Sequence, residues 1–498
     1  MKLEKLLDKI EYTLVKGNLD VLVKDIAYDS RKVLDDYAFV AIIGNNVDGH
    51  DYVENALDSG AKVLIVSKDI GVVDSDITIV KVDDTSKILS RLSMNLFDNP
   101  HKKMTTIAIT GTKGKTTIST MIKKILDDNN KDCGLIGTLG VFYKDKYFHT
   151  MNTSPESYDV FKYMREMLDN GVKYLVMEVS SQSLKLKRWS NVIFDYALFT
   201  NLSLDHVGKD EHDSFEEYKY CKSLLFKQCK TMIGNIDSEY FNEMSNGVDC
   251  EIVTYGKSKN ADYIIDNVNN VMGDGFVGIE LGINGKINEN FKVSIPGLFT
   301  GYNATAAIMV CSLIGLDIDS IRSSLEDVSV KGRMESVKVS NKFSVLIDYA
   351  YQGIAMENVL STIKEGNPKR IVSVFGCGGN RSRQRRFDCG EVSGKYADLS
   401  ILTADNPRYE NNDDIIKDIL VGMNKVNGNY IIVPDRKEAI KKSIVEARDG
   451  DVILILGKGH EDYQEIEGVR YPFDERVVIR EIIDSLSNDE KVRLGIIC

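Results

Sequence analysis

Residues Met104–Thr117 read MTTIAITGTKGKTT, and this stretch decides the fold of the middle of the chain. Its apolar, β-rich first half predicts a buried strand over Thr105–Thr110. The residues that follow, Thr116–Asp128, have apolar positions spaced by three and four, which suits an amphipathic helix. A strand that leads through a glycine-rich loop into a helix is typical of a mononucleotide-binding α/β domain.

The loop itself has the chemistry of a phosphate site. Its glycines let backbone N–H groups approach phosphate oxygens, and the start of the helix adds positive potential. Lys115 is placed to reach the β and γ phosphates, and the Thr116 hydroxyl to ligate Mg²⁺. The strict GxxxxGK[ST] form needs glycine at position 109, where this chain has isoleucine, so the loop is a shorter variant. A glycine-rich turn without a ligand is the alternative. The ATP-binding candidates here are Gly111, Thr112, Lys113, Gly114, Lys115, Thr116 and Thr117.

The rest of the chain continues the alternation of strands and helices, which favours α/β layers with mostly parallel sheets. A second helix is expected over Ser157–Asn170. Further strands are expected over Tyr37–Ile43, Val63–Val66, Lys173–Val179, Tyr196–Thr200, Ser344–Asp348, Arg370–Phe375, Leu399–Thr403 and Val452–Leu456.

Two breaks in this pattern indicate domain boundaries. One is the turn-forming cluster Asp98–His101, and the other lies around Val330–Gly332, where a helical stretch ends in Lys-Gly. The length of 498 residues also suits roughly three domains. We therefore predict three α/β domains over residues 1–103, 104–331 and 332–498.

Composition excludes several classes of protein. Hydrophobic residues make up 43% and charged residues 28% of the chain, which excludes a fibrous or disordered protein. The net charge of −12 gives no reason to expect nonspecific nucleic-acid binding, so any phosphate site must be local. We find no signal peptide, no run of bilayer-spanning length and no CxxC pair, and expect a cytoplasmic protein with reduced cysteines.

Polar residues follow two further predicted strands. Glu178 ends an apolar run in MEVSS, at the edge where a parallel sheet faces its ligand, and is a candidate metal ligand. His206 follows FTNLSLD, although a lone histidine is more often packed or capping than a ligand. Lys222 lies in YCKSLLF, where the ordinary interpretation is that its ammonium extends into solvent.

Together GTKGKTT, MEVSS, FTNLSLDH and YCKSLLF resemble the Mur ligases, the ATP-dependent amino-acid ligases of peptidoglycan precursor synthesis. The resemblance covers nearly the whole chain and is most specific to the type that adds the third amino acid. It implies an α/β fold with the three-domain Mur ligase architecture: a UDP-sugar-binding N-terminal domain, a central P-loop domain and a Rossmann-like, amino-acid-binding C-terminal domain.

The resemblance also implies the chemistry. ATP would phosphorylate the free D-glutamate carboxylate of a UDP-N-acetylmuramoyl dipeptide, and an amine would attack the acyl phosphate. Lys115, Glu178, His206 and Lys222 would be catalytic, and Mg²⁺ would be held by Thr116, Glu178, His206 and Lys222. Lys222 matches a lysine that in this family carries a carbamate; its formation needs a neutral amine, which desolvation favours. We expect only small-molecule partners, with no nucleic acid and no membrane, and a monomer.

Substrate contacts carry over by position. For the UDP-sugar-peptide they are Tyr28, Ser30, Asn45, Asn46, Val47, Asn152, Thr153, Ser154, Ser180 and Arg188. For ATP, Asn303, Arg333 and Asp348 join the loop, although Arg333 also reads as an exposed linker cation. For the amino acid they are Arg386, Asp405, Asn406, Pro407, Arg408, Gly457 and Glu461.

The resemblance also implies that the motif DNPR, here Asp405–Arg408, goes with meso-diaminopimelate rather than L-lysine. Arg408 would pair with the distal carboxylate that lysine lacks, and an unpaired buried arginine would be costly. Arg386 would bind the amino acid's own carboxylate and Glu461 its distal ammonium.

Several positions depart from the family pattern. Tyr351 stands where a histidine is usual. Gln182, which follows the paired serines, also replaces a histidine, and Leu186 replaces a glutamine. Asn380 and Ser382 replace two aspartates. These changes keep two alternatives open: a Mur-like paralogue with another acyl or amino-acid substrate, such as a folylpolyglutamate-type ligase, and a catalytically silent nucleotide-binding protein.

Overall fold

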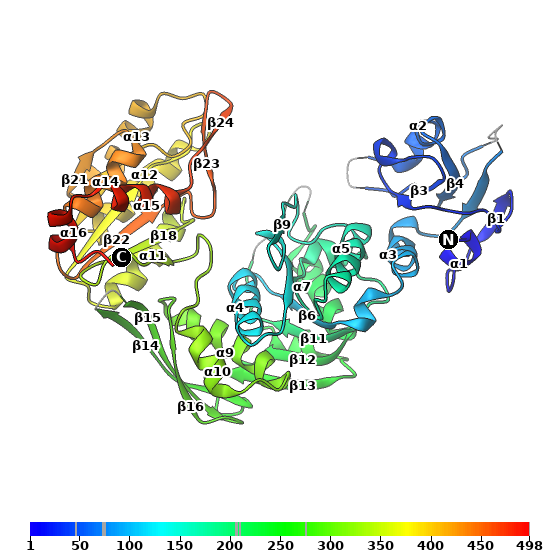
Figure 1. Cartoon of the computed structure of the whole chain (residues 1–498), viewed down its shortest axis with the longest axis horizontal. Coiled ribbons are helices and arrows are strands. Elements are labelled where there is room, and N and C mark those ends of the chain that lie inside the picture. Colours follow the sequence, from blue (N-terminus) through cyan, green and yellow to red (C-terminus); the bar gives the residue numbers. More distant parts are fainter. Residues whose placement is uncertain (45–46, 72–75, 205–207, 209–210, 274–275, 498) are drawn as a thin grey trace. The chain divides into compact units, whose positions relative to one another are not determined.

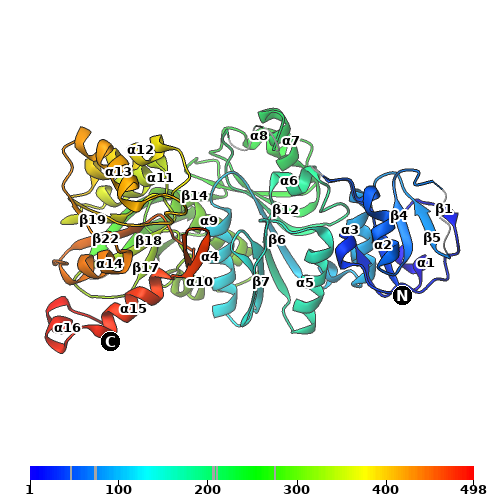
Figure 2. The same cartoon turned by 90° about the horizontal axis from the view of Figure 1, so that it is seen from above.

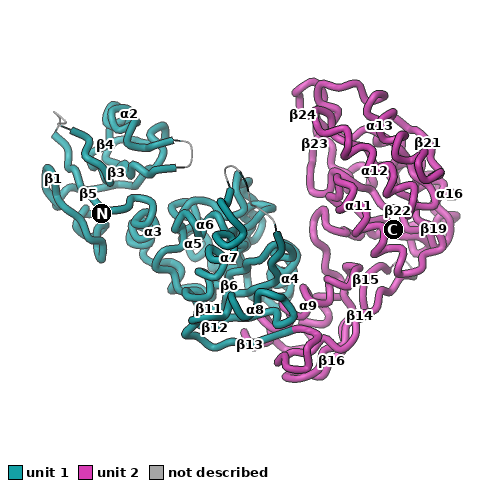
Figure 3. Tube along the Cα trace, turned by 180° about the vertical axis from the view of Figure 1, so that it is seen from behind, with its two compact units in different colours: residues 1–255 teal, residues 256–498 magenta. Residues whose placement is uncertain are grey.

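The computed structural model describes residues 1–44, 47–71, 76–204, 208, 211–273 and 276–497. The chain divides into two compact units, residues 1–255 and residues 256–498, drawn in different colours in Figure 3. The units are described one at a time below. The domain boundaries near residues 103 and 331 stay predictions.

Unit 1 begins with a five-stranded sheet in the order β1-β5-β4-β3-β2. Its strands are parallel except for β1, which runs antiparallel to β5. The elements of this region are α1 (Leu3–Leu6), β1 (Thr13–Lys16), β2 (Ile26–Ala27), β3 (Tyr37–Val40), α2 (Val53–Asp58), β4 (Ala61–Val66), β5 (Thr78–Lys81) and α3 (Thr85–Leu96).

The second sheet of unit 1 has β6 near its centre, in the order β13-β12-β11-β6-β10-β7-β8-β9. Strands β13 to β7 pair in parallel, and β8 and β9 complete an antiparallel edge. The elements are β6 (Thr105–Thr110), α4 (Lys115–Asp128), β7 (Cys133–Gly137), β8 (Gly140–Tyr143), β9 (Lys146–Phe148), α5 (Ser157–Asp169), β10 (Tyr174–Glu178), α6 (Ser181–Lys185), β11 (Phe194–Phe199), α7 (Phe215–Ser223), β12 (Cys229–Asn235), α8 (Phe241–Ser245) and β13 (Glu251–Gly256).

Burial explains why this sheet is parallel. Five of the six residues of β6 and four of the five of β10 are buried, as expected for strands covered on both faces. Helix α5 turns Val160, Phe161, Met164 and Met167 into the same apolar cluster as Leu175 and Met177 of β10. Because all the parallel strands point the same way, their carboxyl ends meet at one edge, where β6 passes into the loop before α4 (Figure 1).

Unit 2 starts with the antiparallel strands β14 (Tyr263–Gly273), β15 (Phe276–Gly285) and β16 (Glu289–Val293), followed by α9 (Leu298–Leu313) and α10 (Ile318–Leu325). A six-stranded sheet comes next, in the order β17-β18-β22-β19-β20-β21. All its pairings are parallel except that of β17 with β18.

Helices cover both faces of this six-stranded sheet. Helices α11, α12 and α13 contribute to one apolar cluster, α14 and α15 to another, and Figure 2 shows the two groups on opposite sides of β18, β19 and β22. The elements are β17 (Glu335–Val337), β18 (Ser344–Asp348), α11 (Gly353–Glu365), β19 (Arg370–Phe375), α12 (Arg383–Tyr396), β20 (Leu399–Leu402), α13 (Asn412–Lys425), β21 (Tyr430–Ile432), α14 (Arg436–Val445), β22 (Asp451–Leu456), β23 (Tyr463–Ile466), β24 (Val469–Pro472), α15 (Glu475–Ser485) and α16 (Asn488–Leu494).

The predicted strands and helices are confirmed, with small differences at their ends. The largest difference is at Tyr37–Ile43, where β3 ends at Val40. Ile43 instead forms an isolated bridge with Asp48, which starts the next turn. Within the part of the chain that the structure describes, no helix has the length and apolar character needed to cross a membrane.

Candidate active site

The glycine-rich loop connects β6 to α4 as the sequence predicts. Gly111 has φ +147°, and a Cβ there would lie 1.9 Å from Oγ1 of Thr200. Gly114 caps α4 with φ +89°. Both positions therefore require glycine, one for close packing and the other for its left-handed backbone.

The end of β11 supports this loop. Asn201 accepts hydrogen bonds from the backbone N–H of Thr112 through its carbonyl at 2.9 Å, and from that of Lys113 through Oδ1 at 2.9 Å. Thr200 donates from Oγ1 to the carbonyl of Lys113 at 2.7 Å. The segment FTN thus holds the shape of the loop, a function that sequence inspection did not assign to it.

Two lysines converge on one carbonyl of the loop. Nζ of Lys115 donates to the Gly111 carbonyl at 2.8 Å and to that of Thr112 at 3.1 Å. Nζ of Lys222, which comes from α7, donates to the same Gly111 carbonyl at 3.0 Å. Lys222 is 2% exposed and lies over the ring of Tyr218, so the interpretation that it extends into solvent is wrong.

A buried carboxylate lies beside these lysines. Glu178 ends β10, and its Oε2 accepts hydrogen bonds from the hydroxyls of Thr116 and Thr138, both at 3.0 Å. The backbone N–H of Thr138 donates to Oε1 at 3.1 Å. Burial raises the pKa of Glu178, while the neighbouring Lys115 and these hydrogen bonds lower it. Sequence inspection did not identify Thr138, because nothing in the segment IGTLG (residues 136–140) indicates contact with Glu178.

The oxygen donors of Thr116 and Glu178 fit Mg²⁺, which prefers hydroxyl and carboxylate oxygens. Their hydrogen bond places both at one point beside the phosphate loop. The predicted ligand His206 lies outside the described residues. Within the described part of the chain, no group of three or more His, Cys, Asp and Glu side chains is gathered as a metal site.

The predicted muramoyl-peptide contacts lie next to Glu178. Ser154 is buried and donates from Oγ to the Glu178 carbonyl at 2.8 Å, and it accepts from the backbone N–H of Ser180 at 3.0 Å. Thr153 contacts Thr138 at 3.0 Å between hydroxyls, while Asn152 is exposed. Arg188 donates to Glu156 at 2.9 Å and to the Ser154 carbonyl at 2.7 Å.

A cavity of about 730 Å³ opens in the N-terminal part of unit 1. Its lining includes three of the predicted UDP-sugar residues, Tyr28, Ser30 and Val47. The predicted Asn45 and Asn46 lie outside the described residues. Residues 28–31 and the described residues Gly44, Val47 and Gly49, which are separated in sequence, therefore border one cavity.

The other ATP candidates belong to unit 2. Asn303 lies in α9, and Arg333 is exposed with its guanidinium 5.6 Å from the centre of the Tyr349 ring. Asp348 is buried at the end of β18 and accepts from the backbone N–H of Met334 at 2.7 Å. Desolvation raises the pKa of Asp348 to about 6. Tyr351 stacks edge-on with Tyr349, with centroids 5.0 Å apart.

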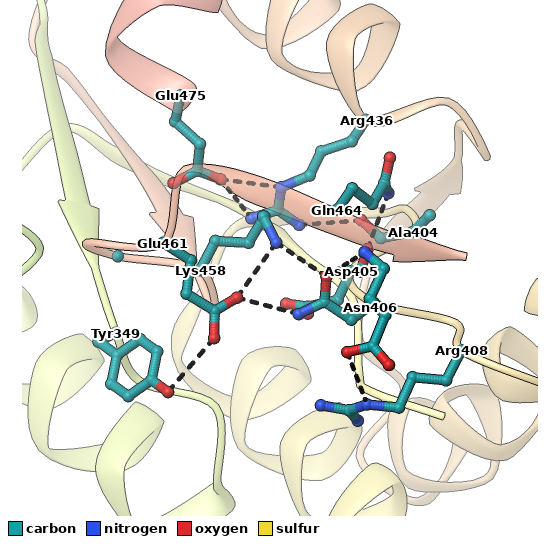
Figure 4. A network of polar contacts seen from close by, with 12 residues as sticks. Tyr349, Ala404, Asp405, Asn406, Arg408, Arg436, Lys458, Glu461, Gln464 and Glu475 are labelled. Atoms are coloured by element: carbon teal, nitrogen blue, oxygen red, sulfur yellow. Dashed lines mark hydrogen bonds and ion pairs between the residues drawn. The ribbon is translucent and has the colours of Figure 1, made fainter. Parts of the chain in front are cut away.

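The predicted amino-acid residues gather where β20 and β22 end. Nδ2 of Asn406 donates to Oε2 of Glu461 at 2.9 Å, and Gly457 packs against the carboxylate of Asp405. Lys458 joins them: it is fully buried, and its Nζ lies 3.2 Å from Oε2 of Glu461 and 3.1 Å from Oδ1 of Asn406 (Figure 4). Lys458 was missed because GKGHE reads as a loop, where lysine is normally solvated.

Arg386 and Arg408 already have carboxylate partners. Arg386 is buried and donates to Asp418 at 3.0 Å and to Glu410 at 2.9 Å. Nε of Arg408 lies 3.5 Å from Oε2 of Glu465, and its Nη1 donates to the Gly379 carbonyl at 2.8 Å. The expectation that Arg408 would be unpaired without its substrate is therefore wrong, because β23 supplies a carboxylate. Pro407 lies between Asn406 and Arg408 in the motif.

A buried ion pair supports the same edge. Arg436 and Glu475 are both fully buried, with Nη2 to Oε1 at 2.6 Å. Arg436 also donates to the carbonyls of Ala404 and Leu456, at 3.1 and 2.8 Å (Figure 4). The pair ties α14 and α15 to the ends of β20 and β22. Both residues lie in amphipathic helices where charge is usually solvated, so the sequence carried no signal for them.

Three family profiles match the chain. The Mur ligase family catalytic domain matches residues 22–95, the Mur ligase middle domain residues 109–311, and the Mur ligase glutamate ligase domain residues 332–459. The chain thus has the three-domain architecture of this family, with mixed α/β sheets.

Curated relatives and a solved structure agree with the profiles. The UDP-N-acetylmuramoyl-L-alanyl-D-glutamate–2,6-diaminopimelate ligase of Caldanaerobacter subterraneus subsp. tengcongensis is 41% identical over 97% of this chain and 99% of its own. The protein of that name from Clostridium perfringens is 39% identical over 97% of this chain and 100% of its own. A solved structure of a ligase with this name aligns with TM-score 0.76 at 27% identity, covering 97% of this chain and 99% of the other. This chain belongs to the Mur ligase family.

Proposed function

We propose that this protein is a UDP-N-acetylmuramoyl-L-alanyl-D-glutamate–2,6-diaminopimelate ligase, of the type called MurE. The observation that carries the ligase chemistry is the convergence of Lys115 and Lys222 on the Gly111 carbonyl, beside the Thr116–Glu178 pair. The names of the relatives, at about 40% identity over nearly the full chain, support the choice of substrates.

The reaction has two steps. A side-chain carboxylate oxygen of D-glutamate attacks the γ-phosphorus of ATP, and ADP leaves with the electrons of the broken P–O bond. The amine of the incoming amino acid then attacks the carbon of the acyl phosphate, inorganic phosphate leaves, and the amine loses a proton. The first step brings two negatively charged groups together, and the second develops negative charge on the carbonyl oxygen and the leaving phosphate, so the protein must supply positive charge and fixed geometry.

Residues of unit 1 supply that environment for the phosphates. The ammonium of Lys115 contacts the Gly111 and Thr112 carbonyls of the loop. Helix α4 begins directly after this loop, so the free backbone N–H groups of its N-terminus add positive potential there. We assign Thr116 and Glu178 to Mg²⁺, together with His206. Bound Mg²⁺ would neutralise charge on the triphosphate. Thr138 keeps the Glu178 carboxylate aimed at this point through two hydrogen bonds.

We further propose that Lys222 functions as a carbamate. The lysine is buried, with its Nζ 3.0 Å from the Gly111 carbonyl and 4.7 Å from the centre of the Tyr218 ring. Addition of CO₂ to Nζ, with loss of a proton, would give the carbamate. The product is an anion, which would supply a further oxygen ligand for Mg²⁺ next to Glu178.

The other substrates are assigned to separate regions. We place the uridine diphosphate in the cavity lined by Tyr28, Ser30 and Val47, and the muramoyl peptide along Asn152–Ser154, Ser180 and Arg188. Asn303, Arg333 and Asp348 are assigned to ATP, and Arg386, Asp405–Arg408, Gly457 and Glu461 to the amino acid. The uridine diphosphate residues lie in the predicted domain 1–103, the muramoyl-peptide residues and Asn303 in 104–331, and Arg333, Asp348 and the amino-acid residues in 332–498. We expect a monomer that acts in the cytoplasm, where ATP and the UDP-linked precursor are available.

The test is ADP release by the purified enzyme with ATP, Mg²⁺ and UDP-N-acetylmuramoyl-L-alanyl-D-glutamate, measured with meso-diaminopimelate, with L-lysine and without an amine. We expect amine-dependent release that is fastest with meso-diaminopimelate, together with a new UDP-linked tripeptide detected by mass spectrometry. Absence of release with either amine would refute the ligase function. Faster turnover with lysine would refute the choice of diaminopimelate.

A further inference from the structure

Cys229 and Cys250 lie with their sulfur atoms in contact. The two Sγ atoms are 3.5 Å apart, and the seven described cysteines are all free thiols. The sulfurs of a disulfide bond are about 2.0 Å apart, so an approach of about 1.5 Å would join this pair. The two residues are 21 positions apart, and no CxxC motif marks them. Folding alone has brought these thiols together.

Neighbouring parallel strands hold the two thiols at this distance. Cys229 is the first residue of β12, and Cys250 directly precedes β13. The two strands pair in parallel from Thr231 and Glu251 onward, and Figure 1 shows them side by side. The hydrogen bonds between the strands therefore fix the distance between the cysteines.

Access to solvent distinguishes this pair from the other described cysteines. Cys229 and Cys250 are partly exposed, whereas the other five described cysteines are buried. Cys377 and Cys389 also contact each other through their side chains, but both are buried. A small oxidant in solvent can thus reach the first pair in the folded protein and cannot reach the second.

We propose that Cys229 and Cys250 form a redox modification site, which small-molecule disulfides such as glutathione disulfide convert into an intramolecular disulfide and which free thiols convert back. A reversible disulfide of this kind suits a compartment that keeps thiols reduced. The inference goes beyond the proposed function and does not rest on it.

The site lies at the opposite edge of the sheet from the phosphate loop. Strands β6, β11 and β12 pair in parallel, and Cys229 is at the amino end of β12, while the loop follows the carboxyl end of β6. The length of β12 separates the two edges by about 20 Å. The modification is therefore separate from the proposed ligase chemistry.

The disulfide forms in two thiol–disulfide exchanges. The thiolate of Cys250 attacks one sulfur of the oxidant, whose S–S bond breaks, and the first thiolate leaves with the electrons of that bond. Cys229 then loses a proton, its sulfur attacks the Cys250 sulfur, and the second thiolate leaves. The two cysteines have lost two electrons and two protons, and the oxidant has become two thiols.

The surroundings of Cys229 explain why Cys250 reacts first. Burial, and after it the neighbouring Cys250, raise the pKa of Cys229, so its thiolate is scarce at neutral pH. Once Cys250 is part of a mixed disulfide it carries no charge, and its opposition to the ionisation of Cys229 disappears. The sulfur of Cys229 then attacks an atom with which it is already in contact.

The test exposes the folded, full-length protein to glutathione disulfide at about pH 8, where thiolates are available. The protein is then denatured in N-ethylmaleimide, which caps the remaining thiols, and a digest made without reductant is mapped by mass spectrometry. We expect the peptides of Cys229 and Cys250 to be joined with the loss of two hydrogens, and dithiothreitol to separate them. Cys377 and Cys389 should be recovered as capped thiols.

Single serine variants separate the roles of the two thiols. Cys229→Ser should accumulate glutathione on Cys250, because the thiol that resolves the mixed disulfide is missing. Cys250→Ser should leave Cys229 largely unmodified. Cys133→Ser is the matched control, since it removes a buried thiol from the same sheet, and it should form the Cys229–Cys250 bond like the wild type.

Capped thiols at both Cys229 and Cys250 in the treated wild type would overturn the inference. So would a Cys377–Cys389 bond that forms first while circular dichroism shows the protein to be folded. A disulfide-linked dimer on a non-reducing gel would overturn it as well, since it would mean that Cys250 reacts with a second molecule rather than with Cys229.

Discussion

Lys115 and Lys222 donate to the same oxygen, the carbonyl of Gly111, at 2.8 and 3.0 Å. The first begins the helix that follows the phosphate loop, and the second lies more than 100 residues further along the chain, in α7. Two lysines on one loop carbonyl define the point where phosphoryl chemistry is expected.

Replacement of Lys222 by alanine should reduce kcat by about a hundredfold or more, as loss of a group that stabilises transition-state charge does. If the lysine acts as a carbamate, short-chain carboxylates such as acetate should restore part of the rate. Lys219→Ala is the control, because Lys219 lies on the same helix and pairs with Glu216 and Glu243. Full activity in Lys222→Ala would exclude the carbamate role.

Replacement of Thr138 by valine should raise the Mg²⁺ concentration needed for half-maximal activity and lower the maximal rate about five- to tenfold. The variant loses the hydroxyl that donates to Oε2 of Glu178 but keeps the backbone N–H that donates to Oε1. Thr138→Ser keeps the hydroxyl and should behave like the wild type. An unchanged Mg²⁺ titration in the valine variant would contradict a positioning role for Thr138.

Asp348 should make the protein less stable as pH rises from about 4 to 6. Its pKa is raised from 3.8 to about 6 by burial, so the folded state retains a proton that the unfolded state loses first. The cost grows through that pH range to about 3 kcal/mol and is constant above it.

Urea unfolding of the wild type and Asp348→Asn at pH 4 and pH 7 measures this cost. The asparagine has no ionisable group but still accepts from the N–H of Met334. Relative to the wild type, it should gain about 3 kcal/mol of unfolding free energy between the two pH values. A difference that does not change with pH would show that Asp348 does not titrate in this window.

Replacement of Glu475 by glutamine should lower the free energy of unfolding by about 3–5 kcal/mol, because it leaves the buried guanidinium of Arg436 without its counter-charge. Urea unfolding measures this loss. The double variant Arg436→Met with Glu475→Met should lose less than the single one, since no unpaired charge remains. Lys437→Ala removes a neighbouring cation whose partner Glu481 is exposed, and it should unfold like the wild type. A single variant as stable as Lys437→Ala would refute the argument.

Local patterns were enough to predict much of this protein. The strand, loop and helix of residues 105–128 are contiguous, so spacing, glycine positions and apolar periodicity specify them without knowledge of the rest of the chain. The same holds for β18, β19 and β22, whose buried apolar runs ended within one residue of the predicted limits. The resemblance to the Mur ligases was enough to assign DNPR and GKGHE to one site, and the structure brings Asn406 and Glu461 of these motifs into contact.

Partners distant in sequence could not be predicted in this way. Nothing near Thr138 indicates that its hydroxyl meets Glu178, and Lys458 looks like a solvated loop lysine until its burial is known. The interpretation of Lys222 as a solvent-exposed cation failed for the same reason, because α7 packs this side chain against the phosphate loop.

The sequence by itself determined the family, the order of strands and helices, and the residue types that carry charge, since these depend on local propensity and on motifs of a few residues. Only the tertiary structure decided which charges neutralise one another: Glu461 with Lys458, Arg386 with Glu410 and Asp418, and Arg408 with Glu465. The physical reason is that electrostatic energy depends on distance and burial, and both are set by how separate elements pack. An acidic chain with a net charge of −12 thus carries its anion-binding groups in a few places that folding brings together.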